Sequence, residues 1–427
     1  MEEILNDKRV KILIVTQYFW PENFRINDLT QELVKRGHTI TVLTGVPNYP
    51  DGEVFDAYRQ NIKKFNLYEG ACVLRVPMLS RGRGVLRLAI NYLSFVLGAC
   101  ICGPWRLRGR QFDVIFVFQT SPVTVGIPAV MLGQIKSVPI VFWVLDLWPE
   151  SLAAVGAVRS RMALDLVGRL VEFIYKRCTL VLGQSRGFVG GIAKYCPDTT
   201  KIRYFPNWAE VVFDNVATTP ATEVLEQQGF FNVLFAGNIG EAQDLPAILL
   251  AAESLKHNTA IRWLIVGDGR KFDWLQNEVK SRGLQSQVLL LGRFPVERMP
   301  SFYVHAGALL VSLKKDPAFS LTVPGKVQSY LLAGVPLIGM LDGEGARVIE
   351  EANAGLVCAA GDSNGLAAAV LKLAAMPVNQ RKQLGANGRV FSNDEFGRSL
   401  LMDRLEKMLF EAVDLYNQAR ANGLFRK

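Results

Sequence analysis

The feature that most constrains the fold of this chain is the alternation of short apolar runs with helical stretches along its whole length. Such runs are typical of parallel strands that helices cover on both faces. The run Val10–Thr16 comes first, then a segment with Ile26, Leu29 and Leu33 on one helical face, and then the run Thr39–Thr44. This succession predicts a β-α-β unit.

The predicted strands fall into two series. The first contains Val10–Thr16, Thr39–Thr44, Val114–Phe118, Ile140–Leu145 and Leu180–Gly183, and the second contains Val233–Ala236, Ile261–Val266, Val288–Leu291, Ala308–Ser312 and Pro336–Met340. A polar stretch at Asn215–Thr222 lies in the linker region between them. With 427 residues, the chain exceeds the size at which a single core keeps growing. We therefore predict an α/β protein with two doubly wound, Rossmann-like domains, 1–206 and 207–393, that face a central cleft. A final helix in 394–427 is expected to return to the first domain.

Composition limits the class of protein. The net charge of +9 favours polyanionic partners without choosing among nucleic acid, anionic lipid and phosphorylated substrate. The segment Met1–Val10 is charged and lacks the apolar core of a secretory signal. No pair of the six cysteines has the two-residue spacing of zinc or thioredoxin-like sites, so free thiols in the cytoplasm are expected.

The loop after the first strand is the first candidate site. It carries Tyr18, Glu22 and Arg25 but no glycine, whereas a dinucleotide-binding protein needs spaced glycines there. NAD binding is therefore not expected. Aromatic and charged side chains in this position suit a sugar or a lipid-phosphate acceptor, and a rigid, proline-anchored connection is the alternative.

A second candidate follows the strand Ile140–Leu145, which ends in Asp146, Trp148 and Glu150. A carboxylate near a low-dielectric cleft can have a raised pKa and remove a proton from an acceptor hydroxyl. The alternative for Asp146 is a helix cap, for which Ser151 competes.

Glycine-rich loops follow three strands of the second series. Gly237 and Asn238 follow one strand, and Gly267 and Gly269 follow the next, so a bulky ligand could approach the backbone. Arg293 and Phe294 follow the third strand, where they could hold a planar base or belong to a tight turn.

The most informative stretch is Asp316–Tyr330. Pro324 suits the first turn of a helix that ends at Gly334. Gly325 and Lys326 at such an N-terminus predict an anion site, because free N–H groups and the helix dipole favour a phosphate. Lys326 would neutralise a diphosphate as it becomes the leaving group.

The series Gly325, Lys326, Gln328, Ser329, Tyr330, Ala333, Gly334 and Pro336 resembles the donor-site helix of glycosyltransferase family 4. The Tyr18–Glu22 loop, the Asp146–Glu150 segment, the Pro206–Asn207 pair and the Gly237–Gln243 loop resemble its WbuB-type branch, which is associated with N-acetyl-L-fucosamine and bacterial surface polysaccharides.

The resemblance implies a GT-B fold, an acceptor-binding first domain, a donor-binding second domain, and transfer with retention from a UDP-sugar, without a cofactor or an obligatory metal. The sugar would be N-acetyl-L-fucosamine or another N-acetylhexosamine, and the acceptor a polyprenyl-diphosphate-linked saccharide of O-antigen or capsule synthesis. The candidate site residues are, for catalysis, Asp146, Lys326 and Asp316; for the donor, Gly237, Asn238, Gln243, Gly267, Gly269, Arg293, Phe294, Pro324, Gly325, Lys326, Val327 and Ser329; and for the acceptor, Tyr18, Glu22, Arg25, Trp148 and Glu150.

The chain also departs from the family pattern. Leu321 and Ser329 occupy the positions of two glutamates that lie eight residues apart in many members, and Asp316 is the candidate replacement carboxylate. Asn238 and Gln243 stand where the family often has arginine and lysine, which leaves more of the diphosphate charge to Lys326.

The segment Leu88–Trp105 has no charged residue and is flanked on both sides by arginines. It is barely long enough to span a membrane, and the β-α alternation needs it as a helix of the first domain. We predict a helix that dips into the inner leaflet, with a plain core helix as the alternative.

Two other functions fit the same architecture. A UDP-sugar epimerase would act without an acceptor, and a catalytically silent subunit would bind the donor without turnover. Nucleic-acid binding is not expected, because the basic residues flank an apolar stretch and show no stacking-platform pattern.

Overall fold

The computed structural model describes residues 9–50, 52–82, 84–154, 156, 158, 160–213, 219–224 and 229–423. Arg83, most of the N-terminal segment and part of the predicted linker therefore lie outside the described residues. The chain forms two compact units. Unit 1 extends to Phe205 and resumes at Met402, and unit 2 is Pro206–Leu401.

The core of unit 1 is an eight-stranded sheet in the order β3-β4-β2-β1-β5-β6-β7-β8. Only β3 runs antiparallel to its neighbour among the described pairs. Its strands are β1 Lys11–Val15, β2 Thr39–Thr44, β3 Leu67–Tyr68, β4 Ala71–Arg75, β5 Val114–Gln119, β6 Ile140–Val144, β7 Leu180–Gly183 and β8 Ile202–Tyr204. The central strand β1 is completely buried at Ile12, Leu13 and Ile14, as expected for a strand covered on both faces.

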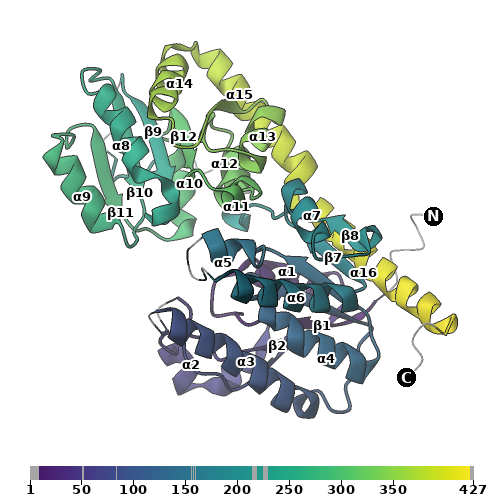
Figure 1. Ribbon diagram of the computed structural model, residues 1–427. Coiled ribbons are helices and arrows are strands. Elements are labelled where there is room, and N and C mark those ends of the chain that lie inside the picture. Colours follow the sequence, from purple (N-terminus) through teal and green to yellow (C-terminus); the bar gives the residue numbers. More distant parts are fainter. Residues whose placement is uncertain are drawn as a thin grey trace. The chain divides into compact units, whose positions relative to one another are not determined.

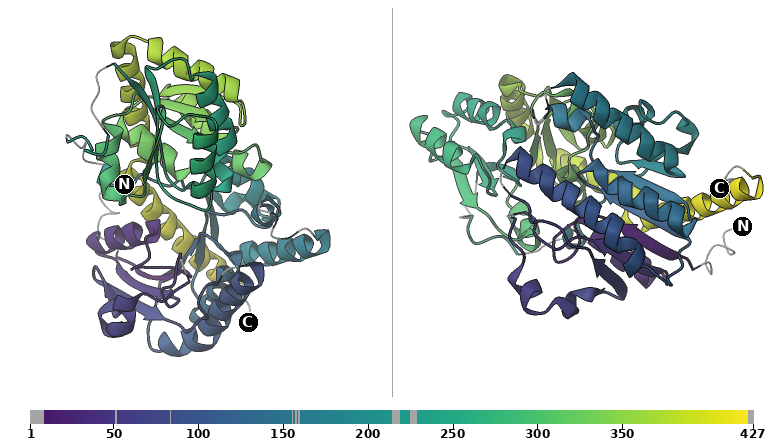
Figure 2. Two further views of the ribbon diagram at one scale, coloured as in Figure 1. Left: turned by 90° about the vertical axis from the view of Figure 1, so that its left-hand side faces the viewer. Right: turned by 60° about the horizontal axis from the view of Figure 1, so that its bottom comes forward.

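Helices cover both faces of this sheet because the chain winds in two directions from β1. The helices are α1 Arg25–Lys35, α2 Asp56–Gln60, α3 Val85–Arg106, α4 Gly126–Lys136, α5 Glu150–Ala154, α6 Arg161–Arg177 and α7 Arg186–Ala193. Right-handed connections place α1 on one face and α3, α4 and α6 on the other. On that second face α4 packs against both α3 and α6 (Figures 1 and 2).

Unit 2 contains a six-stranded, all-parallel sheet in the order β11-β10-β9-β12-β13-β14. Its strands are β9 Phe231–Ala236, β10 Ile261–Val266, β11 Val288–Gly292, β12 Ala308–Ser312, β13 Leu337–Met340 and β14 Gly355–Cys358. Its helices are α8 Leu245–Ser254, α9 Phe272–Ser281, α10 Met299–Tyr303, α11 Pro317–Ser320, α12 Gly325–Ala333, α13 Glu344–Glu351, α14 Ser363–Ala375 and α15 Val378–Phe396. One buried cluster lies on each side of the sheet, and α14 packs on α8 while α15 packs on α12 (Figure 1).

All ten predicted strands are present, with limits that differ by a few residues. The prediction of one continuous helix over Asp394–Ala421 is wrong at its start. Residues up to Phe396 complete α15, Gly397 has non-helical backbone angles, and the last helix α16 is Arg398–Ala421.

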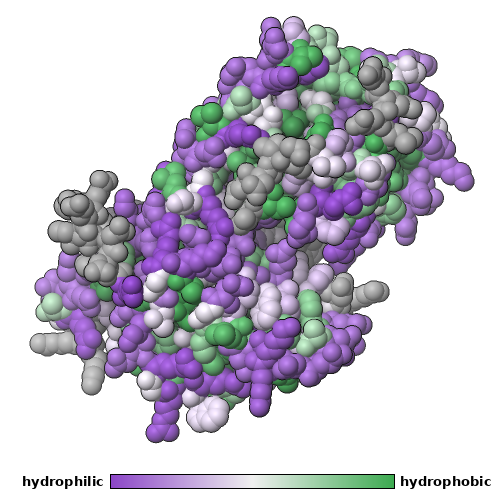
Figure 3. Space-filling view, turned by 180° about the vertical axis from the view of Figure 1, so that it is seen from behind, coloured by the Kyte–Doolittle hydropathy of each residue, from purple (hydrophilic) through white to green (hydrophobic). Residues whose placement is uncertain are grey.

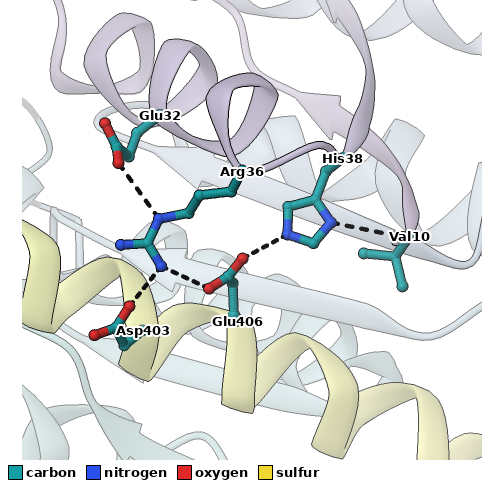
Figure 4. A network of polar contacts seen from close by, with 6 residues as sticks. All are labelled: Val10, Glu32, Arg36, His38, Asp403 and Glu406. Atoms are coloured by element: carbon teal, nitrogen blue, oxygen red, sulfur yellow. Dashed lines mark hydrogen bonds and ion pairs between the residues drawn. The ribbon is translucent and has the colours of Figure 1, made fainter. Parts of the chain in front are cut away.

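From Met402 onward, α16 belongs to unit 1, where Leu405, Leu409 and Ala412 are buried. Figure 4 shows the polar network between α16 and the α1–β2 turn. Glu406 accepts hydrogen bonds from His38 Nε2 at 2.7 Å and from Arg36 Nη1 at 2.7 Å. Because His38 Nδ1 accepts a hydrogen bond from the Val10 N–H at 3.3 Å, the other ring nitrogen, Nε2, carries the hydrogen that is donated to Glu406.

Replacing Glu406 with alanine is expected to destabilise unit 1 by about 2 kcal/mol, because it leaves the buried N–H of His38 without this acceptor and removes one of the carboxylates that pair with Arg36. Chemical denaturation combined with hydrogen exchange of α16 measures this effect. Asp403→Ala is the matched control, because Asp403 also binds Arg36 but is 54% exposed and should contribute less than about 1 kcal/mol. Equal losses in the two variants would contradict this role for Glu406.

Candidate functional site

Each sheet has one point at which the winding direction reverses, between β1 and β5 in unit 1 and between β9 and β12 in unit 2. Ligands of open α/β sheets bind beyond the carboxyl ends of the strands at such points. Most of the residues predicted from the sequence lie in the loops that follow β1, β6, β9, β10, β11 and β12, or in the helices to which these loops lead.

In unit 2, the glycines after β9 and β10 allow two loops to pack directly on each other. A Cβ on Gly267 would lie 1.9 Å from the Gly237 carbonyl oxygen, and one on Gly269 would lie 2.4 Å from the Ile239 carbonyl oxygen. Gly237 and Gly267 also have φ angles of +144° and +145°, which favour glycine. Contact between the two loops therefore requires these glycines, whatever ligand the loops bind.

Lys326 lies in the first turn of α12 and folds back over the β9 loop. Its Nζ donates to Gln243 Oε1 at 2.8 Å and lies 3.8 Å from the centre of the Phe235 ring. A Cβ on Gly237 would be 3.3 Å from this nitrogen, so the glycine leaves room for the ammonium group. Within the described part of the chain, no carboxylate forms an ion pair with Lys326.

Burial lowers the pKa of Lys326 to about 7, although the residue as a whole is only half-buried. The amino group is removed from water and has one amide oxygen and one aromatic face to stabilise its charge. An anion placed against it would supply the missing opposite charge and favour the ammonium form.

The N-terminus of α12 is open at Gly325, where an added Cβ would meet no atom within 4 Å. Pro324 precedes the helix as its N-cap residue, close to its predicted place in the first turn. Val327 is fully buried, so only its backbone could contribute to a ligand site. Helix N-termini carry N–H groups without intrahelical partners, and together with Lys326 they suit a phosphate.

The carboxylate beside Ser329 comes from an unexpected position. Ser329 Oγ donates to Glu210 Oε2 at 2.7 Å, across 119 residues of sequence. Asp316, the predicted replacement, instead caps α11 by accepting the Ala318 N–H at 2.8 Å. Glu210 is therefore the acidic side chain that the fold brings to this face of α12.

The remaining predicted donor residues lie on the same loops with different surroundings. Asn238 is exposed, and an added Cβ on Gly269 would lie 2.6 Å from its Oδ1. Arg293 is exposed after β11. Phe294 packs on Phe302 with ring centres 4.7 Å apart, so its ring is part of the local core.

In unit 1, Asp146 follows β6 and lies in a network of hydrogen-bond donors. Its Oδ2 accepts the Trp148 indole N–H at 2.9 Å, and its Oδ1 accepts the Ser151 hydroxyl. Burial raises the pKa of Asp146 above its ordinary value, while the hydrogen bonds from Ser151, Trp148 and Ser121 favour the carboxylate and oppose the shift. The raised pKa suits a general base, and the hydrogen bonds also hold the loop in place.

The Tyr18 and Glu22 side chains brace the loop after β1. Glu22 is 2% exposed and accepts N–H groups from Phe19, Asn48 and Tyr49 at 3.0, 2.8 and 2.8 Å. Burial raises the pKa of this carboxyl group to about 7. Tyr18 is 3% exposed and its ring stacks on Phe24. Direct contact of either side chain with an acceptor remains a prediction.

The other predicted acceptor residues lie apart from this brace. Arg25 is the first residue of α1 rather than a loop residue. Glu150 begins α5 and its Oε1 lies 3.4 Å from Lys194 Nζ. Trp148 is mostly buried, with its ring centre 6.5 Å from that of Tyr92.

Sequence reasoning missed Phe235, Glu210 and Tyr92. Phe235 is an interior residue of a strand, and Glu210 follows the Pro206–Asn207 pair without a recognisable pattern. Tyr92 belongs to the apolar segment Leu88–Trp105, and it hydrogen-bonds Ser121 beside Asp146. Only the spatial arrangement identifies them.

Other features of the described residues do not extend this site. Among them, no three His, Cys, Asp or Glu side chains gather so that they could hold a metal ion. A depression of about 840 Å³ lies beside the edge strand β11, and Arg262, Asn277 and Lys280 contribute to its lining. None of the predicted site residues lines it.

Comparison with known proteins gives two family matches. Residues 23–208 match the glycosyl transferase 4-like domain, and residues 222–391 match the glycosyl transferases group 1. The chain is 24% identical over 347 residues to WcaI of Escherichia coli (strain K12), which is assigned as a colanic acid biosynthesis glycosyl transferase. This match covers 76% of the chain and 82% of WcaI. It is also 24% identical over 153 residues to the 2-deoxystreptamine N-acetyl-D-glucosaminyltransferase of Niallia circulans, covering 36% of this chain and 37% of that enzyme.

A similar solved structure is that of Anabaena HepE in complex with UDP-glucose. The TM-score is 0.66 at 15% sequence identity, and the match covers 94% of this chain and 100% of HepE. At this identity the likeness establishes the fold, and the predicted GT-B architecture is confirmed.

Proposed function

Because the chain is a glycosyltransferase built from a glycosyl transferase 4-like domain and a group 1 domain, we propose that it moves a sugar from a UDP-sugar to a lipid-linked saccharide. Unit 2 binds the donor and unit 1 binds the acceptor. Transfer proceeds with retention of the anomeric configuration, as the resemblance to family 4 implies.

One observation carries the proposal, namely the ammonium group of Lys326 at the open N-terminus of α12. It is buried against Gln243 and Phe235, and no carboxylate among the described residues pairs with it. A diphosphate supplies the compensating charge and accepts the N–H groups of the helix. Stabilising the diphosphate as it leaves lowers the barrier to transfer.

Asp146 is the candidate base in unit 1. Its carboxylate takes the proton from the acceptor hydroxyl, and its raised pKa makes it a stronger base than an exposed aspartate. Ser329 and Glu210 lie beside α12 and can bind hydroxyl groups of the sugar nucleotide. The Ser329 hydroxyl can donate or accept a hydrogen bond, and the Glu210 carboxylate can accept one.

The substrates are proposed from the relatives. WcaI is assigned to colanic acid biosynthesis, and the Niallia circulans enzyme is an N-acetyl-D-glucosaminyltransferase. We accordingly place the chain in bacterial surface polysaccharide synthesis, as O-antigen or capsule, at the inner face of the cytoplasmic membrane. The transferred sugar is an N-acetylhexosamine, and the resemblance to the WbuB-type branch favours N-acetyl-L-fucosamine.

Purified protein incubated with a panel of UDP-sugars and lipid-linked monosaccharides is expected to release UDP only when an acceptor is present. Mass spectrometry should show an acceptor heavier by one sugar. Isomerised donor without acceptor would instead identify an epimerase. Binding of the donor without turnover under every acceptor would identify a silent subunit, the alternative that Leu321 and Ser329 favour by replacing the two glutamates.

A further inference from the structure

The outer face of α3 carries a continuous stripe of large apolar side chains. They recur every three or four residues and are between 42% and 74% exposed: Leu86, Ile90, Leu93, Leu97, Ile101 and Trp105. By length and composition, α3 is the one helix among the described residues that could cross a membrane, yet only a third of its apolar window is buried. Single exposed apolar residues are ordinary, as on the face in Figure 3, where hydrophobic patches are small and separate. A stripe of this length marks an interaction surface.

The opposite face of α3 is fixed in unit 1. Phe95 and Ala99 are completely buried, and a Cβ on Gly98 would lie 2.1 Å from the Pro77 carbonyl oxygen. Asn91 Oδ1 accepts a hydrogen bond from Gln17 Nε2 at 2.8 Å. A bilayer-spanning position would break this layer of the fold, so the stripe can only meet a surface from one side.

The charges in the segment that carries the stripe all have one sign. Between residues 70 and 112 the sequence contains no aspartate or glutamate. Arg87 lies at one end of α3, and Arg106 and Arg108 lie at the other, all three exposed. Arginines can extend to phosphate headgroups while the apolar stripe enters the layer below, and tryptophan favours the interface between them.

We propose that the outer face of α3 docks unit 1 on a bilayer that contains anionic phospholipids. The helix lies in the interfacial plane, with its stripe in the headgroup and acyl boundary and its terminal arginines on lipid phosphates. A second copy of the chain fits this surface less well, because pairing two α3 helices would bring their arginines together without an acidic residue in the segment to neutralise them.

Docking on α3 also has a consequence for the site in unit 1. Asn91 binds Gln17 in the loop after β1, and the neighbouring Tyr92 packs on Trp148 beside Asp146. The same helix therefore joins the exposed stripe to both candidate acceptor loops. This step rests on the proposed function, since it places those loops near the headgroups, where a lipid-linked saccharide is presented.

Flotation with vesicles tests the docking without any need for enzymatic activity. The protein is expected to float with vesicles of phosphatidylcholine and phosphatidylglycerol and to bind pure phosphatidylcholine vesicles less. About 1 M NaCl, at which the Debye length is only ~3 Å, or alkaline carbonate should release at least part of it. Retention after both washes would mean a spanning helix, and absence from both kinds of vesicle would mean that no lipid docks there; either result overturns the proposal.

Two substitutions separate the apolar and the charged contributions. Leu97→Asp is expected to reduce vesicle binding by at least about tenfold, because it places a carboxylate in the apolar layer. Leu250→Asp, on an exposed leucine of α8 in unit 2, is the matched control and should bind as the wild type does. Joint replacement of Arg106, Arg108 and Arg110 by serine should weaken binding to anionic vesicles by about 100-fold, because about 1 kcal/mol for each arginine amounts to about 3 kcal/mol. Binding to neutral vesicles should be unchanged.

UDP binding by calorimetry and the thermal unfolding midpoint are measured on the same samples. Unchanged values show that Leu97→Asp is folded, so its loss of flotation is specific. Suppose that the wild type does not float and is a dimer, and that Leu97→Asp dissociates this dimer. A second copy of the chain would then cover the stripe, and the proposal would be wrong. Flotation without UDP binding by the wild type would count against the proposed function alone.

Discussion

Replacing Lys326 with alanine is expected to lower the affinity for UDP and for UDP-sugars together by about 10- to 100-fold. This loss corresponds to about 1.5–3 kcal/mol, the usual contribution of a hydrogen bond to a charged group. The reason is that the ammonium group, held by Gln243 and Phe235 at the N-terminus of α12, is the proposed partner of the diphosphate. Titration calorimetry with UDP measures the change.

The same lysine predicts how the affinity depends on pH. In the empty domain, burial lowers its pKa to about 7, and a bound diphosphate raises it again by stabilising the charged form. Binding therefore takes up a proton above pH 7, and UDP affinity should fall by up to about tenfold per pH unit there and level off below pH 7. Lys326→Met should remove this dependence.

Lys280→Ala is the control, because Lys280 is an exposed lysine of the same unit that lies on α9. It changes the net charge equally and should leave the affinity nearly unchanged. UDP binding by Lys326→Ala at wild-type affinity would remove the residue from the donor site. A loss of equal size in both variants would indicate a general effect of net charge.

The α12 site also shows what sequence can predict and what it cannot. Pro324 and Gly334 define the two ends of a helix by local backbone preferences, so the position of Lys326 follows from neighbouring residues. The carboxylate beside Ser329 does not, because Glu210 lies 119 residues earlier and is brought there by the fold. Asp316 was the better candidate by distance in sequence, but its local preference for capping α11 takes precedence.

A similar division holds for the sheets. Nine of the ten predicted strands lie inside their sheets and are mostly apolar because both faces are buried, and the tenth, β11, is an apolar run at a sheet edge. Strands β3, β8 and β14 were missed, since each lies at a sheet edge, is at most four residues long and is partly exposed. β4 was missed because it alternates between buried and half-buried residues. The glycine loops were located correctly, but their close packing on each other depends on neighbouring strands and could not be read from either loop alone.

Replacing Asp146 with asparagine is expected to lower turnover by about 10²- to 10⁴-fold while leaving donor affinity nearly unchanged. Asparagine has the same shape and can still accept the Trp148 indole N–H, but it cannot take a proton from an acceptor hydroxyl. Donor affinity should persist because the proposed donor site, on the loops around α12, belongs to unit 2, whereas Asp146 belongs to unit 1. Initial rates with saturating UDP-sugar, together with UDP calorimetry, measure both quantities.

A structural role for Asp146 predicts a different pattern. If the carboxylate only holds the loop, removing its Ser151 partner should reduce the rate as much as Asp146→Asn does. If it is the base, Ser151→Ala should retain most of the turnover. Burial raises the pKa of Asp146, and a base must be deprotonated, so the wild-type rate should fall as pH decreases through a value above the ordinary one for aspartate. Loss of the Ser151 hydrogen bond, which favours the carboxylate, should move that fall in rate to a still higher pH, a shift that a bracing role does not produce.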